Sequence, residues 1–186
     1  MPEVFVSIGS CFKRKENVRA AMKALRKRFG SIQYSSVYET EAVGFVGDSF
    51  YNLVVSFESD ESPEALKQFF KSLERSRGRL AAVKTPGPVS LDLDLLLYGD
   101  LIIEQPGLKL PRVDVLQHAF VLKPLSELAP GRIYPGTQQT YAELWRDYQA
   151  RFLPRGIVQL SWDPLGPVRA LPGWCYPDYT QALLPG

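Results

Sequence analysis

The chain has 186 residues and a mass of 20.9 kDa, which accommodates one domain of ordinary size and about forty further residues. Its hydrophobic content of 45% and aromatic content of 12% can supply a buried core, so a disordered chain and a small disulfide scaffold are both excluded. The 22 Lys and Arg residues nearly balance the 20 Asp and Glu residues. This balance creates no global field that favours a nucleic acid or a membrane surface as partner.

Residues that commonly bind transition metals are scarce. Cys11 and Cys175 show no C-x-x-C spacing and His118 is the sole histidine, which excludes a cysteine or histidine cage but leaves a carboxylate site for a hard cation open. The apolar run over 4–8 is too short for a signal peptide, and no run reaches the roughly 20 apolar residues of a membrane span. We therefore expect a soluble cytoplasmic protein with reduced thiols that binds neither nucleic acid nor membrane.

The first third of the chain predicts a strand, a helix and two further strands. Residues 4–8 are rich in β-formers, and apolar residues then recur at helical spacing from 15 to 29. The other faces of this helix are basic, and we interpret them as solvated because the interleaved aromatic residues of a nucleic-acid surface are missing. Residues 31–40 and 50–57 predict two strands joined by a Gly-containing loop over 41–49.

The next segment contains the clearest helix signals. Ser62 suits the N-cap, Pro63 suits the first helical position, and an apolar stripe follows as far as Leu73 before Gly78. A fourth strand is predicted over 90–98. The order β-α-β-β-α-β indicates an α+β fold of the ferredoxin-like type, in which two helices cover one face of an antiparallel sheet.

The C-terminal part of the chain has a different composition. Residues 116–128 and 141–152 have helical patterns, so we place the domain boundary near 150. Residues 151–186 contain six of the 15 prolines and two of the three tryptophans. Prolines disfavour regular structure, whereas tryptophans favour burial. We expect an irregular strap packed on a domain formed by residues 1–150.

Two carboxylates stand in the otherwise apolar fourth strand. Alternation puts Asp92 and Asp94 on one face of the strand and the flanking leucines on the other. Two carboxylates on a buried face are costly unless they are compensated. Either each aspartate pairs with an Arg or Lys on a neighbouring strand, or the two bind Mg²⁺ together with a phosphate substrate.

An ordered series of short motifs carries a family resemblance. The chain resembles the 6-hydroxymethyl-7,8-dihydropterin pyrophosphokinases over roughly residues 4–135, and the block L-D-L-D-L-L-L-Y-G after a Gly-Pro dipeptide is the most specific element. The matching stretches are 6–10, 37–40, 50–52, 87–88, 91–99, 110–111, 119–122 and 124–125. The resemblance implies the ferredoxin-like fold and transfer of pyrophosphate from ATP to a pterin alcohol, with release of AMP.

The resemblance also implies roles for individual residues. Asp92 and Asp94 would bind two Mg²⁺ ions between ATP and the pterin hydroxymethyl group. On the pterin side, backbone groups of Thr40 and Val43, the Asn52 side chain, and the rings of Phe50 and Phe120 would hold the substrate. On the nucleotide side, the resemblance points to Lys71, Glu74, Arg79, Lys84, Arg112 and His118.

The departures from the family concern the phosphate-binding residues. Val89 occupies the position of a family arginine just before the aspartate pair, so the phosphate clamp is thinner than in relatives. Two hypotheses remain open: an active pyrophosphokinase, of full or reduced rate, or a paralogue that binds pterin and nucleotide with little catalysis. Small-molecule substrates and a monomeric state are expected in either case.

Overall fold

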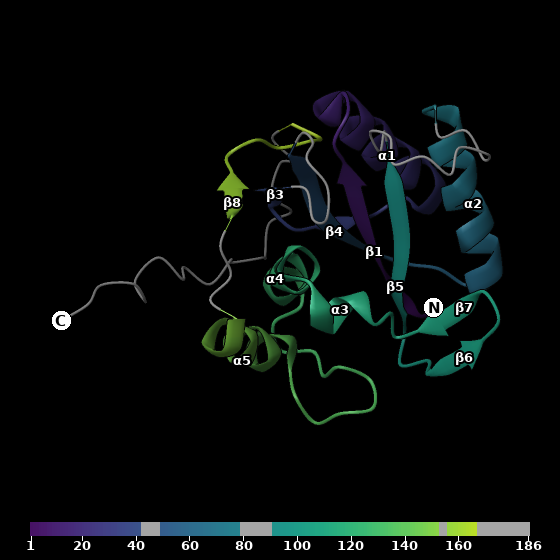
Figure 1. Cartoon of the computed structure of the whole chain (residues 1–186). Coiled ribbons are helices and arrows are strands. Elements are labelled where there is room, and N and C mark those ends of the chain that lie inside the picture. The colour runs from purple at the N-terminus through teal and green to yellow at the C-terminus, as the bar shows by residue number, and fades with distance from the viewer. Residues whose placement is uncertain (42–48, 79–90, 153–155, 167–186) are drawn as a thin grey trace.

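The computed structural model describes residues 1–41, 49–78, 91–152 and 156–166. It is built around one central sheet flanked by helices (Figure 1). The elements in chain order are β1 (Glu3–Ser10), α1 (Arg14–Phe29), β2 (Gln33–Tyr34), β3 (Val37–Thr40), β4 (Phe50–Glu58), α2 (Pro63–Ser76), β5 (Asp92–Tyr98), β6 (Ile103–Gln105), β7 (Leu108–Leu110), α3 (Asp114–Gln117), α4 (Ala119–Leu128), α5 (Tyr141–Phe152) and β8 (Ile157–Leu160).

The central sheet has the strand order β5-β1-β4-β3-β8, and the short strand β2 also pairs with β4. Each of these pairings is antiparallel. The sequence β1-α1-β3-β4-α2-β5 confirms the predicted ferredoxin-like order of strands and helices. Residues 31–40 were expected to form one strand, but the structure divides them into β2 and β3. Two residues separate these strands, and the second, Ser36, donates from its N–H and its hydroxyl to Glu127 Oε1.

Helices α1 and α2 form where the sequence signals predicted them. The Ser62 hydroxyl accepts from the backbone N–H of Ala65 at 3.2 Å, and Pro63 is the first helical residue of α2. In α1, a stripe of buried residues that includes Val18, Met22 and Leu25 faces the sheet. Both apolar stripes are therefore satisfied by packing on the same sheet.

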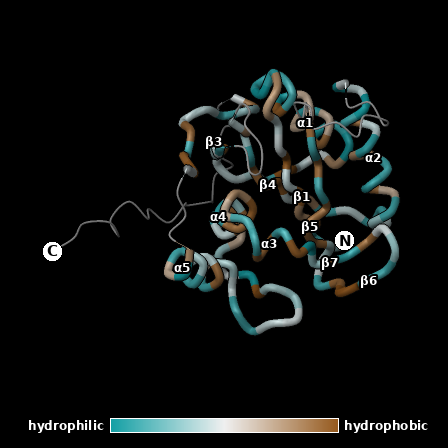
Figure 2. The backbone as a smooth tube through the Cα atoms, in the orientation of Figure 1, coloured by the Kyte–Doolittle hydropathy of each residue, from teal (hydrophilic) through white to brown (hydrophobic). Residues whose placement is uncertain are grey.

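Hydrophobic clusters lie on both faces of the sheet. The first cluster joins α1 and α2 to residues such as Ile8, Leu53 and Leu93. The second joins α4 and α5 to Phe5 and Val54, which point to the other side of β1 and β4. Figure 2 shows hydrophobic residues concentrated in the central strands. Helices α1 and α2 cover one face, as predicted, and α4 and α5 add a layer on the other.

The strand β8 was not expected. Residues 157–160 pair with β3, from Ile157 opposite Thr40 to Leu160 opposite Val37. The expectation of irregular structure beyond residue 150 is wrong for these residues, because a short run of β-formers between prolines completes the sheet at its β3 edge. Trp162 follows β8 and lies beside Tyr51, with 5.9 Å between ring centroids. Residues 167–186 of the expected strap lie outside the described part of the chain.

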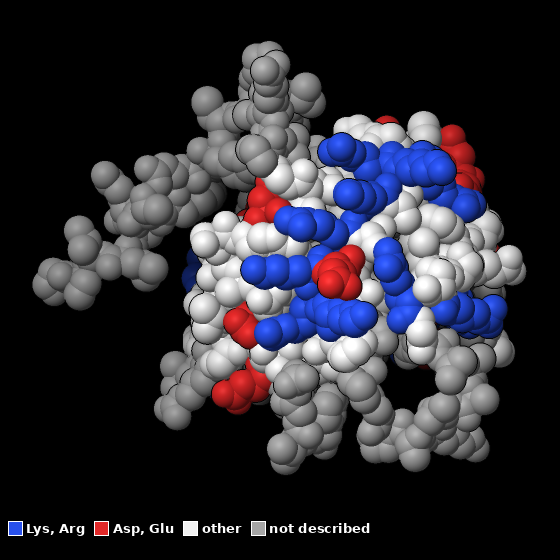
Figure 3. Space-filling model, turned by 90° about the horizontal axis from the view of Figure 1, so that it is seen from above, with Lys and Arg blue, Asp and Glu red and all other residues white. Residues whose placement is uncertain are grey.

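The exposed side of α1 is basic. Figure 3 shows Lys and Arg side chains spread across the face of the molecule seen from above, which is the side of α1 in Figure 1. The exposed cations of this helix include Lys15, Arg19, Lys23, Arg26 and Lys27. Within the part of the chain that the structure describes, no helix combines the length and the apolar character that a membrane crossing requires.

Candidate active site

Asp92 and Asp94 lie at the start of β5, on the sheet face opposite α1 and α2. Leu93 and Leu95 alternate with them and are buried in the first cluster, so the predicted division of the strand into two faces is confirmed. Asp92 is paired in register with Gly9 of β1, and Asp94 with Ser7. Both aspartates are partly exposed. The Cα atoms of residues i and i+2 of a strand are about 6.5–7 Å apart. One bound group can therefore contact both carboxylates.

A chain of ion pairs extends from Asp94. The Arg112 guanidinium lies 3.1 Å from Asp94 Oδ2 through Nη2 and 2.5 Å from Asp114 Oδ2 through Nε. The other Asp114 oxygen lies 3.6 Å from His118 Nε2. The backbone N–H of Arg112 donates to Leu96 O at 2.9 Å, which fixes the arginine beside β5. The structure therefore brings Arg112 and His118 together near the aspartate pair.

These contacts bear on the two roles considered for the aspartates, which are pairing with an Arg or Lys and binding of Mg²⁺ with a phosphate substrate. Pairing with a basic residue holds for Asp94, although its partner follows β7 and does not belong to a neighbouring strand of the sheet. The pair is about one-third exposed at each side chain, 38% for Arg112 and 32% for Asp94. Exposed pairs of this kind contribute at most about 1 kcal/mol. Arg112 can thus turn toward a phosphate group without a large loss of stability.

The pterin-side residues expected from β3 and β4 also meet. The Asn52 amide donates from Nδ2 to Thr40 Oγ1 at 2.8 Å, and both side chains are buried. Phe50 is paired in register with Thr40. Gly9 of β1 is the cross-strand neighbour of Asn52 on one side and of Asp92 on the other. Asp92, Gly9 and Asn52 therefore form one row across three strands, and glycine leaves the middle of that row open.

Phe120 lies at the N-terminus of α4, on the same side of the sheet. Its ring stacks on the His118 ring with 4.8 Å between centroids and 14° between planes. Phe120 also packs against the second hydrophobic cluster and is only partly buried. One side of the Phe120 ring is thus fixed by the His118 ring, which suits an aromatic platform for a planar ligand.

Of the remaining residues expected at the site, two lie on α2 and three lie outside the described part of the chain. Glu74 of α2 is buried and accepts from the backbone N–H of Leu93 at 2.9 Å, so it ties α2 to the strand segment between the two aspartates. Lys71 is exposed on the same helix, on the other side of the sheet from the carboxylates. Val43, Arg79 and Lys84 lie outside the described residues, as does Val89.

The donor set fits a magnesium ion. The candidate ligands are the carboxylates of Asp92 and Asp94, which share one face of β5. Among the described residues, no three or more His, Cys, Asp or Glu side chains are grouped so that they could hold a metal ion. Carboxylate oxygens are the ligands that Mg²⁺ prefers, and Mg²⁺ commonly takes its other ligands from water and substrate phosphates. A carboxylate pair beside an arginine is therefore a suitable place for a metal-bound phosphate.

Two neighbours of the site were missed by sequence reasoning. Asp114 connects Arg112 to His118, and the available signal was its spacing of four residues from His118, which directly follows the short helix α3. Tyr38 donates from its hydroxyl to Glu127 Oε2 at 2.7 Å. Burial, with this hydrogen bond as the next cause, raises the pKa of Tyr38. The bond ties β3 to α4, but nothing in the local sequence pairs these two residues.

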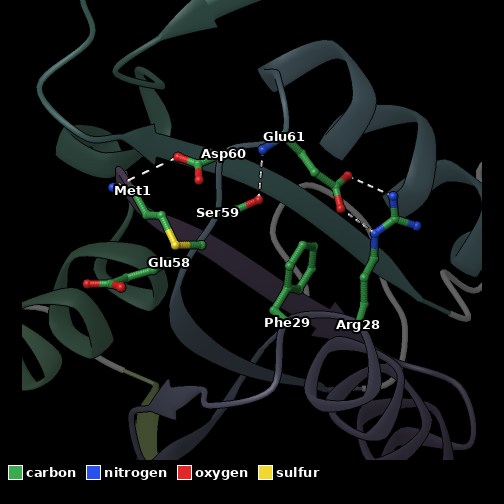
Figure 4. Close-up of a pocket in the computed structure, with 7 residues that line it drawn as sticks. All are labelled: Met1, Arg28, Phe29, Glu58, Ser59, Asp60 and Glu61. Atoms are coloured by element: carbon green, nitrogen blue, oxygen red, sulfur yellow. Dashed lines mark hydrogen bonds and ion pairs between the residues drawn. The ribbon is translucent and has the colours of Figure 1, made fainter.

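A separate depression lies at the opposite end of β1 and β4 (Figure 4). It is lined by Met1, Arg28, Phe29, Glu58, Ser59, Asp60 and Glu61. Arg28 holds Glu61 through two hydrogen bonds, of 2.8 and 2.7 Å. The register of β1 and β4 puts Glu3 and Glu58 at this end, and Gly9 and Asn52 at the other. The depression therefore includes none of the residues expected for the site.

The comparisons with known proteins show the family of the chain. The sequence model of the 7,8-dihydro-6-hydroxymethylpterin-pyrophosphokinase (HPPK) family matches residues 5–130. The chain belongs to this family. The HPPK match contains Asp92, Asp94, Asn52 and Phe120, but α5 and β8 lie beyond it.

The curated relatives differ in length. The 2-amino-4-hydroxy-6-hydroxymethyldihydropteridine pyrophosphokinase of Pseudomonas aeruginosa is 31% identical over 131 residues, which are 68% of this chain and 80% of that protein. The enzyme of the same name from Haemophilus influenzae is 31% identical over 74% of this chain and 88% of its own length. A folic acid synthesis protein of Schizosaccharomyces pombe is 34% identical over 75% of this chain, but the match spans only 19% of that protein.

Solved HPPK-DHPS structures share the fold. One, in complex with substrates, has a TM-score of 0.69 and 11% identity, and the match covers 85% of this chain and 46% of that one. Wild-type HPPK-DHPS of Plasmodium falciparum has a TM-score of 0.63 and 14% identity, over 81% of this chain and 45% of that one. The chain thus spans less than half the length of these structures.

Proposed function

We propose that the protein transfers a pyrophosphoryl group from ATP to the hydroxymethyl oxygen of 6-hydroxymethyl-7,8-dihydropterin and releases AMP. One observation carries the proposal: Asp92, Gly9 and Asn52 lie in one row of register-paired positions across β5, β1 and β4. On the same face of the sheet, Asp94 lies two residues further along β5, and Thr40 of β3 is bonded to Asn52. A pterin whose edge meets Asn52 can therefore extend its side chain toward the carboxylates.

The pterin site is formed by β3, β4 and the start of α4. The buried Asn52 amide and Thr40 supply donors and acceptors for the edge of the pterin ring. Phe50 and Phe120 supply aromatic surfaces for its two faces. Because the His118 ring stacks on Phe120, binding of the pterin loses little conformational entropy at that side chain.

The nucleotide site adjoins the carboxylates. Asp92 and Asp94 would hold two Mg²⁺ ions, which supply positive charge that neutralises the phosphates and polarises the hydroxyl group. Arg112 lies next to Asp94 and can bind a phosphate through the two nitrogens of its fork. Asp114 keeps Arg112 and His118 at this edge of the site.

The reaction forms one bond and breaks one. The pterin hydroxymethyl oxygen bonds to the β-phosphorus of ATP and loses its proton. The bond from the β-phosphorus to the oxygen that bridges to the α-phosphorus breaks, and AMP leaves with that oxygen. The side chains act mainly by holding both substrates in line and by placing the Arg112 guanidinium where negative charge develops.

Pterin-dependent AMP release tests this function. The protein is incubated with ATP, Mg²⁺ and 6-hydroxymethyl-7,8-dihydropterin, and AMP is quantified by chromatography. We expect AMP in this mixture and background levels when the pterin is replaced by 6-methyl-7,8-dihydropterin, which lacks the accepting hydroxyl. Tight binding of pterin and ATP without AMP formation would instead support a binding paralogue.

A further inference from the structure

Arg14, the first residue of α1, connects three segments of the chain. Its Nη1 donates to Glu39 Oε1 at 2.7 Å and to the backbone carbonyl of Ser49 at 3.2 Å, and it also contacts the Ser49 hydroxyl. The Ser49 hydroxyl in turn donates to Glu39 Oε1 at 2.5 Å. Glu39 lies in β3 and Ser49 directly precedes β4. One guanidinium thus joins α1 to both strands.

An aromatic contact completes this cluster. The Arg14 guanidinium lies over the Tyr51 ring, 4.3 Å from its centroid. Tyr51 is the register partner of Glu39, so the arginine spans a cross-strand pair. Tyr51 also lies beside Trp162, and the Arg19 guanidinium is 5.6 Å from the centroid of the Trp162 ring. Arg14 therefore combines a ring contact with hydrogen bonds, and its side chain is 30% exposed.

The cluster lies directly behind the pterin-side residues. Because side chains alternate along a strand, Glu39 and Tyr51 point toward α1 whereas Thr40 and Asn52 point to the opposite face. Glu39 is the neighbour of Thr40 in sequence, and Ser49 is the neighbour of Phe50. Fixing Glu39 and Ser49 together therefore fixes the spacing of Thr40 and Phe50, which are register partners.

We propose that Arg14 is a positioning residue for the pterin site, which holds the ends of β3 and β4 together so that Thr40, Phe50 and Asn52 keep the spacing that the pterin ring requires. This role rests on the proposed function of the site. It predicts a selective effect on the pterin, because ATP is bound near β5 and Arg112, on the far side of Gly9.

Arg28 of the same helix provides a matched control. It also forms hydrogen bonds to a carboxylate, that of Glu61, at 2.8 and 2.7 Å, and it lies over the Phe69 ring at 4.2 Å. Arg28→Ala removes the same charge and the same kinds of contact as Arg14→Ala. It does so at the opposite end of the sheet, so any effect of net charge is common to both variants.

The experiment measures pterin and ATP separately. The dissociation constant of 6-hydroxymethyl-7,8-dihydropterin is measured by calorimetry with a non-hydrolysable ATP analogue and Mg²⁺, and KM values are measured for both substrates. For Arg14→Ala we expect an increase of about tenfold in the pterin constants and less than about twofold in the KM for ATP. Arg28→Ala should leave both within about twofold. Ser49→Ala, which keeps all charges, should raise the pterin constants in the same direction.

The outcomes separate this role from the proposed function. If the wild-type protein binds no pterin, the proposed function fails and the role of Arg14 fails with it. If the wild-type protein binds pterin and Arg14→Ala binds it equally well, only the positioning role is overturned. Equal losses in Arg14→Ala and Arg28→Ala would also overturn it. Should Arg14→Ala fail to fold, Ser49→Ala and Glu39→Gln decide by the same measurements, and unchanged pterin affinity in both overturns the role.

Discussion

Adding a single methyl group at Gly9 should disrupt the pterin site specifically. A Cβ at Gly9 would lie 3.2 Å from Asn52 Oδ1 and 4.0 Å from Phe50 Cδ1. Asn52 must then move by a few tenths of an ångström, yet its amide is buried and bonded to Thr40 at 2.8 Å. An Asn52 amide displaced from the edge of the pterin ring leaves a buried hydrogen bond to the substrate unmade, which costs about 1–3 kcal/mol of binding free energy. Gly9→Ala should therefore raise the KM for the pterin by about 5- to 150-fold.

The assay is steady-state AMP release at varied pterin and saturating ATP. Gly131→Ala is the matched control, because a Cβ at Gly131 meets no atom within 4 Å, and it should leave the pterin KM unchanged. Thermal unfolding should show that Gly9→Ala remains folded, since glycine-to-alanine changes in strands shift stability by about 1 kcal/mol or less. An unchanged pterin KM in a folded Gly9→Ala protein would refute the placement of the pterin edge at Asn52.

Three further predictions concern the charged residues. Asp92→Asn and Asp94→Asn should each lower Mg²⁺-dependent AMP release by about 10²-fold or more while circular dichroism shows an intact fold; wild-type turnover in both would contradict the metal assignment. Arg112→Ala should raise the KM for ATP by about tenfold and lower the unfolding free energy by less than about 1 kcal/mol. An unchanged KM for ATP would show that Arg112 does not bind the nucleotide. Hydrogen bonds from the Ser49 hydroxyl, and next from Arg14, lower the pKa of Glu39 below its ordinary value of 4.5. The ionised Glu39 carboxylate therefore stabilises the fold above pH 4.5, and this stabilisation is lost as pH falls through the lower pKa of the folded state. In urea unfolding, the stability difference between wild type and Glu39→Gln should shrink as pH falls through that range, and a difference independent of pH would contradict the ionised pair.

Much of the fold is encoded in local patterns. The cap formed by Ser62 and Pro63 and the apolar stripes of α1 and α2 are short-range signals, and the structure confirms them. Alternation in β5 placed Asp92 and Asp94 on one face because the strand period is independent of its partners. The order of strands and helices then leaves few possible sheet topologies, and the observed one follows.

Other features depend on contacts between distant segments. β8 was missed because its four residues stand among prolines and glycines, and only pairing with β3 makes them a strand. The contact of Arg112 with Asp94 depends on the hairpin of β6 and β7, which was not predicted. Arg14 reaches residues 25 and 35 positions away along the chain. No local periodicity reports such distances, so these contacts become visible only in the folded chain.

The most direct measurement follows the transferred group itself. ATP labelled separately in its β- and γ-phosphates is incubated with Mg²⁺, 6-hydroxymethyl-7,8-dihydropterin and the protein, and the pterin product is analysed by mass spectrometry and ³¹P NMR. Our account predicts that both labels enter the pterin together and that one AMP forms for each pterin diphosphate. Formation of ADP with a pterin monophosphate, or of AMP with free pyrophosphate and unmodified pterin, would contradict it.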